Sequence, residues 1–260
     1  MKKESKKGSS GTQSIDRALM LLQMFDDERA EWKLSQLAKE TALNRTTVYR
    51  ILSALERERF LAYDSEKESY RLGSAMIVLG ARALRANSLR TVAHPELVRL
   101  AKLTGEMASL EVLEGENTLI LDEVKGEKQK RMNTSIGNVW PAHATSTGRI
   151  LLSNIPKKQR WKTFSFPLEA VTPVTTTDKE TLDKLLMRCR EEGFAVVVDE
   201  LEVGSTECAV PVYNYKKEVI GALSVCGPTI RLQEGDIRDI IELLRESCLT
   251  ISQQMGFRGK

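Results

Sequence analysis

Residues 34–58 constrain the fold more than any other stretch of this chain, because they predict two short helices joined by a tight turn. Leu34 and Leu37 have the i, i+3 spacing of a buried helical stripe. Ser35 and Asn44 are good N-cap residues, so we expect the first helix to begin at Ser35 and the second just after Asn44. A helix pair of this kind can pack one side into a small domain and offer its second helix to a DNA groove.

The second helix of the pair separates an apolar face from a polar face. Its apolar positions are Val48, Ile51, Leu52 and Leu55. The polar candidates for DNA contact, together with Ser35 of the first helix and the capping Asn44, are Arg45, Thr46, Thr47, Tyr49 and Arg50. An arginine can bind a guanine edge through two hydrogen bonds, and a threonine can reach bases or phosphates. Taken alone, the stretch is also compatible with an ordinary helical hairpin that has a solvated charged face.

The flanking segments favour a DNA-binding domain. Residues 14–25 predict an amphipathic helix with one shared apolar face formed by Ile15, Ala18, Leu19, Leu22 and Phe25. Residues 60–63 and 70–72 predict two short strands around a polar turn. Three helices followed by a hairpin make a winged helix-turn-helix. Lys67 and Arg71 would then lie on or beside the wing, as phosphate contacts or as solvated surface charges.

Charge is distributed unevenly along the chain. Residues 1–90 contain 17 Lys and Arg against 12 Asp and Glu, which gives +5, and the remainder contributes −2 to the net +3. A basic N-terminal third fits a DNA-binding part joined to a different second part. We expect residues 1–12, with four lysines, to form a disordered basic arm that either contacts DNA electrostatically or serves as a solubilising tail.

The composition excludes several classes of protein. No run of eighteen apolar residues occurs, so we expect no membrane span, and no apolar segment follows the N-terminal lysines as in a secretory signal. The four cysteines form no CxxC pair, which suits free thiols in a reducing cytoplasm. With only two histidines, a site built on several His ligands is nearly excluded, and we expect no metal or cofactor.

The rest of the chain predicts a linker helix and a second domain. Residues 74–88 are rich in Ala and Leu and predict a helix that connects the domains and contacts a second protomer, after a DNA-binding domain at 13–73. Residues 89–257 alternate strands with helices. Strands are predicted at 107–113, 118–124, 194–198, 209–212 and 219–225, and helices at 89–104, 146–152, 178–193 and 235–255. Antiparallel strand pairs covered by helices indicate an α+β sensor domain.

Several short stretches, in this order, resemble the IclR family of bacterial transcriptional regulators. They are Ser14-Ile-Asp-Arg-Ala-Leu, Leu43-Asn-Arg-Thr-Thr-Val-Tyr-Arg, Tyr70-Arg-Leu-Gly, Pro141-Ala-His-Ala-Thr-Ser-Thr-Gly, Cys208-Ala-Val-Pro-Val and Ser224-Val-Cys-Gly-Pro. The resemblance covers about residues 14–256. It implies a winged helix-turn-helix, a linker helix and a GAF-like effector-binding domain, in dimers or tetramers that bind operator DNA and a small effector, often a carboxylate.

The resemblance also implies where the effector binds. The implied site consists of Gly137, Trp140, Ala144, Thr145, Ser146, Asp199, Cys208, Ser224 and Cys226. Physical reasoning supports parts of it, because the free N–H groups at a helix N-terminus such as Ala144–Ser146 favour a carboxylate. Ser224 and Cys226 alternate along a strand and share a face. Each of these residues could instead be structural, Cys208 as a buried small hydrophobe and Asp199 as a solvated loop acid.

We therefore expect a sequence-specific DNA-binding regulator, a repressor of a catabolic operon that is controlled by a small organic acid. Its partners would be double-stranded operator DNA, the effector and a second copy of the chain. A transcriptional activator of the same type and a thiol-based redox sensor using Cys208 or Cys226 are the alternatives. Catalysis would need a site such as a Cys208–His143 pair, and because no catalytic motif occurs we expect no enzyme.

Overall fold

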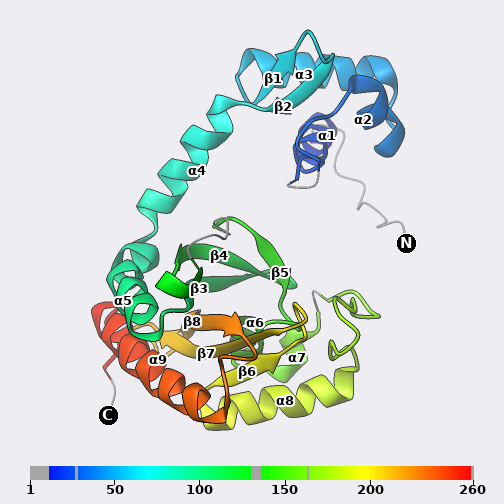
Figure 1. The fold of residues 1–260 in the computed structure, drawn as a ribbon. Helices are drawn as coiled ribbons and strands as arrows, with labels where there is room; N and C mark the ends of the chain where they lie inside the picture. Colours follow the sequence, from blue (N-terminus) through cyan, green and yellow to red (C-terminus); the bar gives the residue numbers. More distant parts are fainter. Residues whose placement is uncertain (1–11, 27–28, 130–135, 163, 259–260) are drawn as a thin grey trace. The chain divides into compact units, whose positions relative to one another are not determined.

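The computed structural model describes residues 12–26, 29–129, 136–162 and 164–258. The expected basic arm at residues 1–12 lies, except for Thr12, outside the described residues. The chain divides into two compact units, unit 1 at Met1–Ala86 and unit 2 at Asn87–Lys260 (Figure 1). Within the described part of the chain, no helix has both the length and the apolar character needed to cross a lipid bilayer.

Unit 1 has the helices and hairpin expected of a winged helix-turn-helix. Its elements are α1 (Gln13–Leu22), α2 (Leu34–Glu40), α3 (Arg45–Arg57), β1 (Leu61–Asp64), β2 (Ser69–Leu72) and α4 (Ser74–Ala86). β1 and β2 pair antiparallel, and Trp32 forms an additional antiparallel bridge with Tyr70. The core of this unit contains Leu21, Leu37 and Leu52, all fully buried.

Two details of the first helices differ from the sequence predictions. α2 begins at Leu34, so its N-cap is Lys33 and not Ser35. The backbone N–H of Lys33 donates to the Gln36 side chain at 3.0 Å. In α1, Ile15 and Leu19 are 60% and 53% exposed, so they are not on the buried face. Leu21 is fully buried instead, which turns the core-facing stripe of this helix away from Ile15.

α4 has no buried residue, although most of its side chains are apolar or small. Ile77, Val78 and Leu79 are 73%, 46% and 48% exposed. Exposed contiguous apolar surface is uncommon on a monomeric protein, and among the described residues nothing buries this face of α4.

Unit 2 is built on an antiparallel sheet with the strand order β5-β4-β3-β8-β7-β6. The strands are β3 (Met107–Glu114), β4 (Asn117–Val124), β5 (Val139–Pro141), β6 (Ala195–Val198), β7 (Ser205–Tyr213) and β8 (Val219–Pro228). All of these strands except β5 were predicted. β3 pairs antiparallel with β4, and β7 with β8, so each pair is a hairpin around the polar turn that the sequence indicated. The short helix η1 (Glu127–Gln129) follows β4.

Helices cover both faces of this sheet (Figure 1). α5 (Ser88–Thr104) and α9 (Glu234–Gln254) pack on one face over a core that includes Leu110, Val210 and Leu223. α6 (Ser146–Ser153) and α8 (Lys179–Glu192) lie on the other, and α7 (Lys157–Arg160) precedes α8. The α+β architecture is confirmed, and the face that carries α6 also carries the candidate ligand site.

Candidate functional site

The second helix of the pair, α3, exposes the polar residues that the sequence singled out. The Asn44 side chain accepts a hydrogen bond from the Thr46 backbone N–H at 2.8 Å, so Asn44 is the N-cap as predicted. Arg45, Thr46 and Arg50 are exposed, as is Tyr49 at 56%, while Thr47 is partly buried. A capped helix with a basic, exposed first turn has the features of a helix that enters the DNA major groove.

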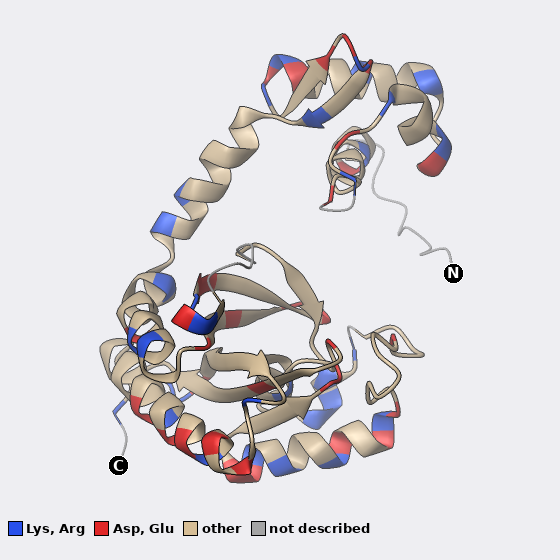
Figure 2. Cartoon of the chain, in the orientation of Figure 1, with Lys and Arg blue, Asp and Glu red and all other residues tan. Residues whose placement is uncertain are grey.

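Of the two wing candidates, one is already paired. Lys67 lies in the β1–β2 turn, where its Nζ is 2.8 Å from Glu31 Oε1, and this carboxylate raises the pKa of Lys67. Its charge is partly neutralised by Glu31, which weakens its case as a phosphate contact. Arg71 is exposed on β2. Figure 2 shows that acidic residues accompany the basic ones along the helices and hairpin of unit 1.

In unit 2, the face of the sheet that carries α6 encloses a cavity of about 330 Å³, here called the acidic cavity. Five carboxylates line it: Glu111, Glu123, Glu200, Glu202 and Glu207. The apolar lining is Met107, Ile120, Trp140, Val197 and Leu201. Among the described residues that form its lining there is no Lys, Arg or His.

Glu111 on β3 is the most deeply buried of these carboxylates. Its Oε1 accepts from Ser109 Oγ at 3.0 Å and its Oε2 from Thr147 Oγ1 at 2.6 Å. Desolvation, followed by the charge of Glu207, raises the pKa of Glu111 to about 7 despite these hydrogen bonds. Its carboxyl group therefore changes protonation near neutral pH, which is unusual for a glutamate and common at functional sites.

Glu207 on β7 occupies the N-terminus of α6. Its Oε2 accepts from the Ser146 backbone N–H at 2.8 Å, while the Gly148 N–H donates to Thr145 Oγ1 at 3.0 Å. The Ala144 N–H donates to the Pro141 carbonyl at 2.9 Å. Two of the amides that were expected to bind an effector carboxylate, those of Ala144 and Ser146, therefore already have partners within the protein. A carboxylate ligand at Ser146 would have to compete with Glu207 for that amide.

Cys208, which was predicted to contact the effector, does not line the acidic cavity. It pairs with Val225 across β7 and β8, and both point to the face covered by α5 and α9, where Cys208 is fully buried in the apolar core. Its neighbour Glu207 points to the opposite face, into the acidic cavity. His143 is on the α6 side, with Nε2 2.8 Å from the Glu169 carbonyl, so the considered Cys208–His143 pair is not formed.

Asp199 and Gly137 also have structural roles. Asp199 has a positive φ of 62°, and its Oδ1 accepts from the Gly204 N–H at 2.8 Å and from Thr229 Oγ1 at 3.2 Å, which stabilises the turn before β7. Its neighbour Glu200 lines the cavity instead. Gly137, with a φ of 93°, donates its N–H to the Ile120 carbonyl at 2.9 Å and is not part of the lining.

Four of the predicted effector residues lie at or beside the cavity. Trp140, Thr145 and Cys226 line it. Ser224 is buried directly behind this wall, with its Oγ 2.8 Å from Ser109 Oγ. The prediction that Ser224 and Cys226 share a face is confirmed, since they pair with Ser109 and Met107 of the lining. The sequence prediction missed Glu111 and Glu207, because isolated glutamates in a strand resemble solvated ones.

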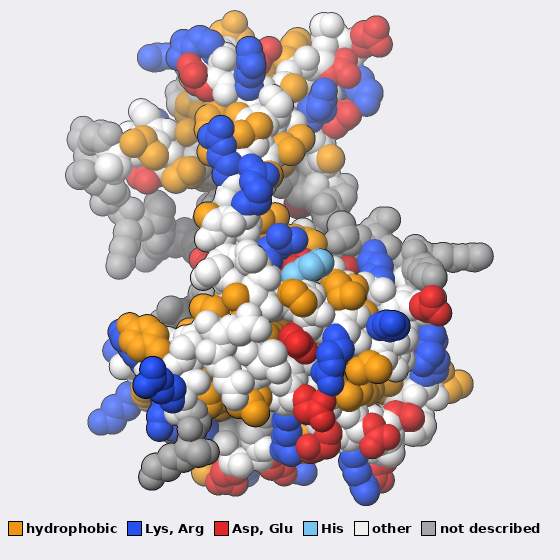
Figure 3. Space-filling model, turned by 90° about the vertical axis from the view of Figure 1, so that its left-hand side faces the viewer, with side chains coloured by type: hydrophobic (Ala, Val, Ile, Leu, Met, Phe, Trp, Pro, Cys, Tyr) orange, Lys and Arg blue, Asp and Glu red, His pale blue; other side chains and the backbone are white. Residues whose placement is uncertain are grey.

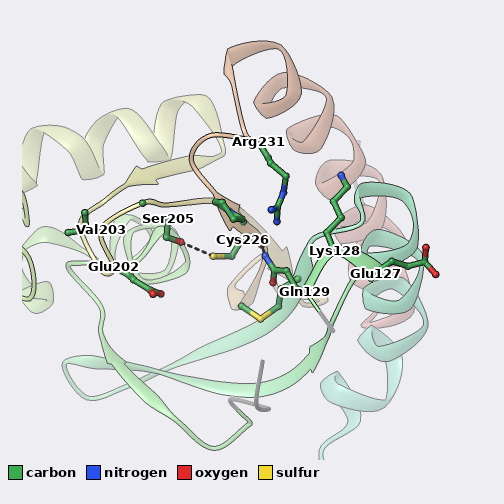
Figure 4. A pocket seen from close by; sticks show the side chains of 12 residues that line it. Glu127, Lys128, Gln129, Glu202, Val203, Ser205, Cys226 and Arg231 are labelled. Atoms are coloured by element: carbon green, nitrogen blue, oxygen red, sulfur yellow. Dashed lines mark hydrogen bonds between the residues drawn. The ribbon is translucent and has the colours of Figure 1, made fainter. Parts of the chain in front are cut away.

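A second, adjoining cavity of about 590 Å³ shares four lining residues with the acidic cavity, namely Met107, Glu202, Ser205 and Cys226. We call these four the junction. Figure 4 shows Gln129, Lys128 and Arg231 on the other side of the adjoining cavity from Glu202 and Ser205. Both cations lie close to the buried Glu106, with Lys128 Nζ 3.7 Å from Oε1 and Arg231 Nη2 2.7 Å from Oε2.

Burial keeps the thiols of Cys208, in the apolar core, and Cys226, in the cavity wall, protonated at neutral pH. Desolvation, with the Glu207 charge as the second cause, raises the pKa of both Cys208 and Cys226 to about 12. Redox-sensing cysteines have lowered pKa values and exposed sulfur atoms. Neither thiol has these properties, which argues against the redox-sensor alternative.

Comparison with known proteins identifies both units. Residues 14–65 match the family model of the IclR helix-turn-helix domain, and residues 81–253 match that of the bacterial transcriptional regulator IclR C-terminal domain. The chain belongs to the IclR family. It is 28% identical over 246 residues to the HTH-type transcriptional regulator XynR of Escherichia coli strain K12, which covers 94% of this chain and 98% of that protein.

Two further IclR-family relatives bear on function. The HTH-type transcriptional repressor AllR of E. coli strain K12 is 27% identical over 250 residues, covering 96% of this chain and 92% of AllR. A solved structure of an IclR homologue from Microbacterium hydrocarbonoxydans, complexed with 4-hydroxybenzoate, superimposes with a TM-score of 0.79 at 27% identity, covering 93% and 98% of the two chains. Like these relatives, this chain is a DNA-binding transcriptional regulator of the helix-turn-helix type.

Proposed function

We propose that the protein is a transcriptional repressor of a catabolic operon, which binds operator DNA through α3 and releases it when a small molecule occupies the acidic cavity. The observation that carries the proposal is the combination of an exposed, capped α3 with a lined cavity in a separate unit. The ligand would favour one arrangement of the units over another and so change DNA affinity. Selection of DNA sites by the purified protein, followed by footprinting with and without cell metabolites, tests it.

Repression is favoured over activation by the likeness to AllR, a repressor. Ligand control is favoured by the likeness to a structure that holds 4-hydroxybenzoate. DNA binding would take place in the cytoplasm. An operator-fused reporter whose expression falls when the regulator is deleted would contradict repression and leave activation.

Arg45→Ala should weaken binding to the selected operator by roughly 1–3 kcal/mol, because a bidentate arginine contact to a guanine contributes about that much discrimination. Binding to scrambled DNA should change less. Arg57→Ala is the matched control, since Arg57 lies in the last turn of the same helix and pairs with Glu58 on the surface. Fluorescence anisotropy with both DNAs measures the effect, and an equal loss for operator and scrambled DNA would contradict base reading by Arg45.

A homodimer or a dimer of dimers should form, because one short recognition helix contacts too few base pairs for genomic specificity. We propose α4 as a contact between protomers, through its exposed Ile77 and Leu79. Figure 3 shows further hydrophobic side chains among charged ones on the face of unit 2 that α5 and α9 present, which could serve a second contact.

Leu79→Glu should shift the protein toward the monomer in light scattering at micromolar concentration and weaken DNA binding. Ser74→Glu, on the same helix and also exposed, is the control that should leave the mass unchanged. A monomer for the unsubstituted protein, both alone and on DNA, would contradict the proposed dimer.

A further inference from the structure

The chemistry of the acidic cavity indicates which kind of small molecule it takes. Buried carboxylates are normally paired with a cation or saturated with hydrogen-bond donors, because a lone buried charge is costly. Of the five lining carboxylates, Glu200 meets this rule through Arg149, with Oε2 2.5 Å from Arg149 Nη2, and Glu123 Oε1 lies 4.0 Å from Lys125 Nζ. Glu111 and Glu207 have hydroxyl and amide donors but no cation within the hydrogen-bond and ion-pair contacts of the described residues.

The carboxylates converge on the junction between the two cavities. Glu111, Glu202 and Glu207 line the acidic cavity together with Cys226, and Glu207 is the cross-strand neighbour of Cys226. Glu202 lines both cavities. A ligand cation at the junction would therefore lie close to carboxylates in a setting of low dielectric, where electrostatic attraction is strong.

A second, independent feature points to a donor in the ligand. The Gln129 amide is buried, with 9% of the residue exposed, and it lines the adjoining cavity. Its Nε2 donates to Glu106 Oε2 at 3.0 Å and to the Cys226 carbonyl at 3.1 Å, which fixes the orientation of the amide. Its Oε1 has no hydrogen-bond partner among the described residues. Figure 4 shows the side chain reaching from η1 toward Cys226, so this buried acceptor, without a partner in the described part of the chain, lies beside the junction.

The remaining lining suits an organic cation better than a metal ion. No group of three or more His, Cys, Asp or Glu side chains in the described ranges is close enough together to hold a metal. The carboxylates instead surround a space of about 330 Å³, which fits a small organic molecule. Trp140 offers an aromatic face that attracts a cation, and Ile120 and Leu201 offer apolar surface for the body of the molecule.

We propose that the effector of this regulator is an organic amine, whose ammonium group lies at the junction between Glu207, Glu202 and Gln129 and whose apolar or aromatic body contacts Trp140. This inference rests on the proposed ligand-controlled function and names the ligand class. It differs from the organic acid that the resemblance implied, because Glu207 already accepts from the Ser146 amide. A neutral polyol is the alternative donor-bearing ligand that the test must separate.

Three probes with the same body and different head groups test the proposal on the full chain. Benzylamine is a cation, benzyl alcohol a neutral donor and benzoate an anion at neutral pH. Titration calorimetry should show benzylamine binding most tightly, benzyl alcohol at least about tenfold more weakly, and benzoate weakest. Tighter binding of benzyl alcohol would favour a polyol, and tighter binding of benzoate would restore the acid. Either result, or no binding by benzylamine, overturns the proposal.

The pH dependence gives a second readout. An ammonium group binds the ionised form of Glu111 and Glu207, so benzylamine affinity should rise about tenfold from about pH 6 to about pH 8, with proton release from the protein. Benzoate affinity should fall over the same interval. An amine affinity that is flat or falls with pH would show that these carboxylates do not contact the ammonium group.

Matched variants locate the site. Glu207→Gln preserves an acceptor for the Ser146 N–H but removes the charge, and it should weaken benzylamine binding at least tenfold. Glu114→Gln, an exposed glutamate on β3, should not change it. Cys208→Ala, next in sequence but on the other face of β7, should also leave it unchanged. Equal loss in all three variants would indicate a general structural effect and contradict the assignment.

DNA binding is measured separately on the same samples. Specific operator binding without any probe tests the proposed function alone. If it fails while benzylamine binds through Glu207, the regulator proposal is wrong and the amine site remains. If the operator is bound specifically and benzylamine does not bind, the regulator proposal remains and the ligand class is wrong.

Discussion

Between about pH 5 and about pH 8, the free energy of unfolding of unit 2 is expected to fall by roughly 3 kcal/mol on account of Glu111. Burial, and then the charge of Glu207 on β7, raise the pKa of Glu111 from 4.5 to about 7 in the folded protein. Between these two values the folded state holds a proton that the unfolded state has lost. The stabilisation is therefore complete below pH 4.5 and is lost as the pH rises through about 7.

Calorimetric unfolding of the full chain at several pH values, followed through the transition of unit 2, measures this slope. The hydroxyl groups of Ser109 on β3, Thr118 on β4 and Thr147 on α6 oppose the shift without cancelling it. Glu111→Gln should flatten the dependence, while Glu114→Gln should preserve it because Glu114 is exposed. An unchanged slope in Glu111→Gln would show that another group dominates.

Arg149→Met should lower the stability of unit 2 by about 3–5 kcal/mol, because it leaves the buried Glu200 carboxylate without its cation. The Arg149 and Glu200 side chains are 4% and 12% exposed. Arg149 Nε also donates to the His143 carbonyl at 3.2 Å, so this side chain holds the loop before α6 to the segment before β7. Glu200 Oε2 accepts a further hydrogen bond from the Thr176 N–H at 2.7 Å.

The double variant Arg149→Met with Glu200→Met should recover much of this loss, since it removes both charges together. The Arg188–Glu192 pair on α8 is a matched surface control with Arg188 72% exposed, so Arg188→Met should cost less than about 1 kcal/mol. Denaturant unfolding of the unsubstituted protein and these variants, with Glu200→Met added to complete the cycle, measures the coupling. Equal losses in Arg149→Met and the double variant would mean that the carboxylate finds other partners.

Local signals in the sequence predicted the elements of both units well. Asn44 and Asp178 were assigned as helix starts, and in the structure their side chains accept from Thr46 and Thr181 N–H groups. Gly193 was assigned to the end of α8 and adopts the left-handed conformation there, with φ 73°. Caps and turns depend on residues close in sequence, so one sequence is enough to locate them.

The candidate ligand site could be predicted only in part, because it depends on contacts between distant segments. β7 is buried on both faces, so the apolar run that follows Glu207 and Cys208 does not indicate which of the two faces the cavity. The answer comes from the register in which Glu207 pairs with Cys226 on β8. The sequence also did not show which of two neighbouring acids, Asp199 or Glu200, lines the cavity. The positive φ of Asp199 decides this, and a positive φ at a residue other than glycine is not evident from one sequence.

The Glu207 side chain can be regarded as a carboxylate that is tethered to the protein and competes with free carboxylates for the Ser146 amide. Its carboxylate is joined to the protein by its own side chain, so its effective concentration at the Ser146 amide is on the order of millimolar or higher, as for other short tethers. A free carboxylate would have to displace it from that amide while meeting its repulsion. Removing the carboxylate in Glu207→Ala would vacate the amide, and the same scaffold would then be expected to bind small anions there more tightly than the unsubstituted protein.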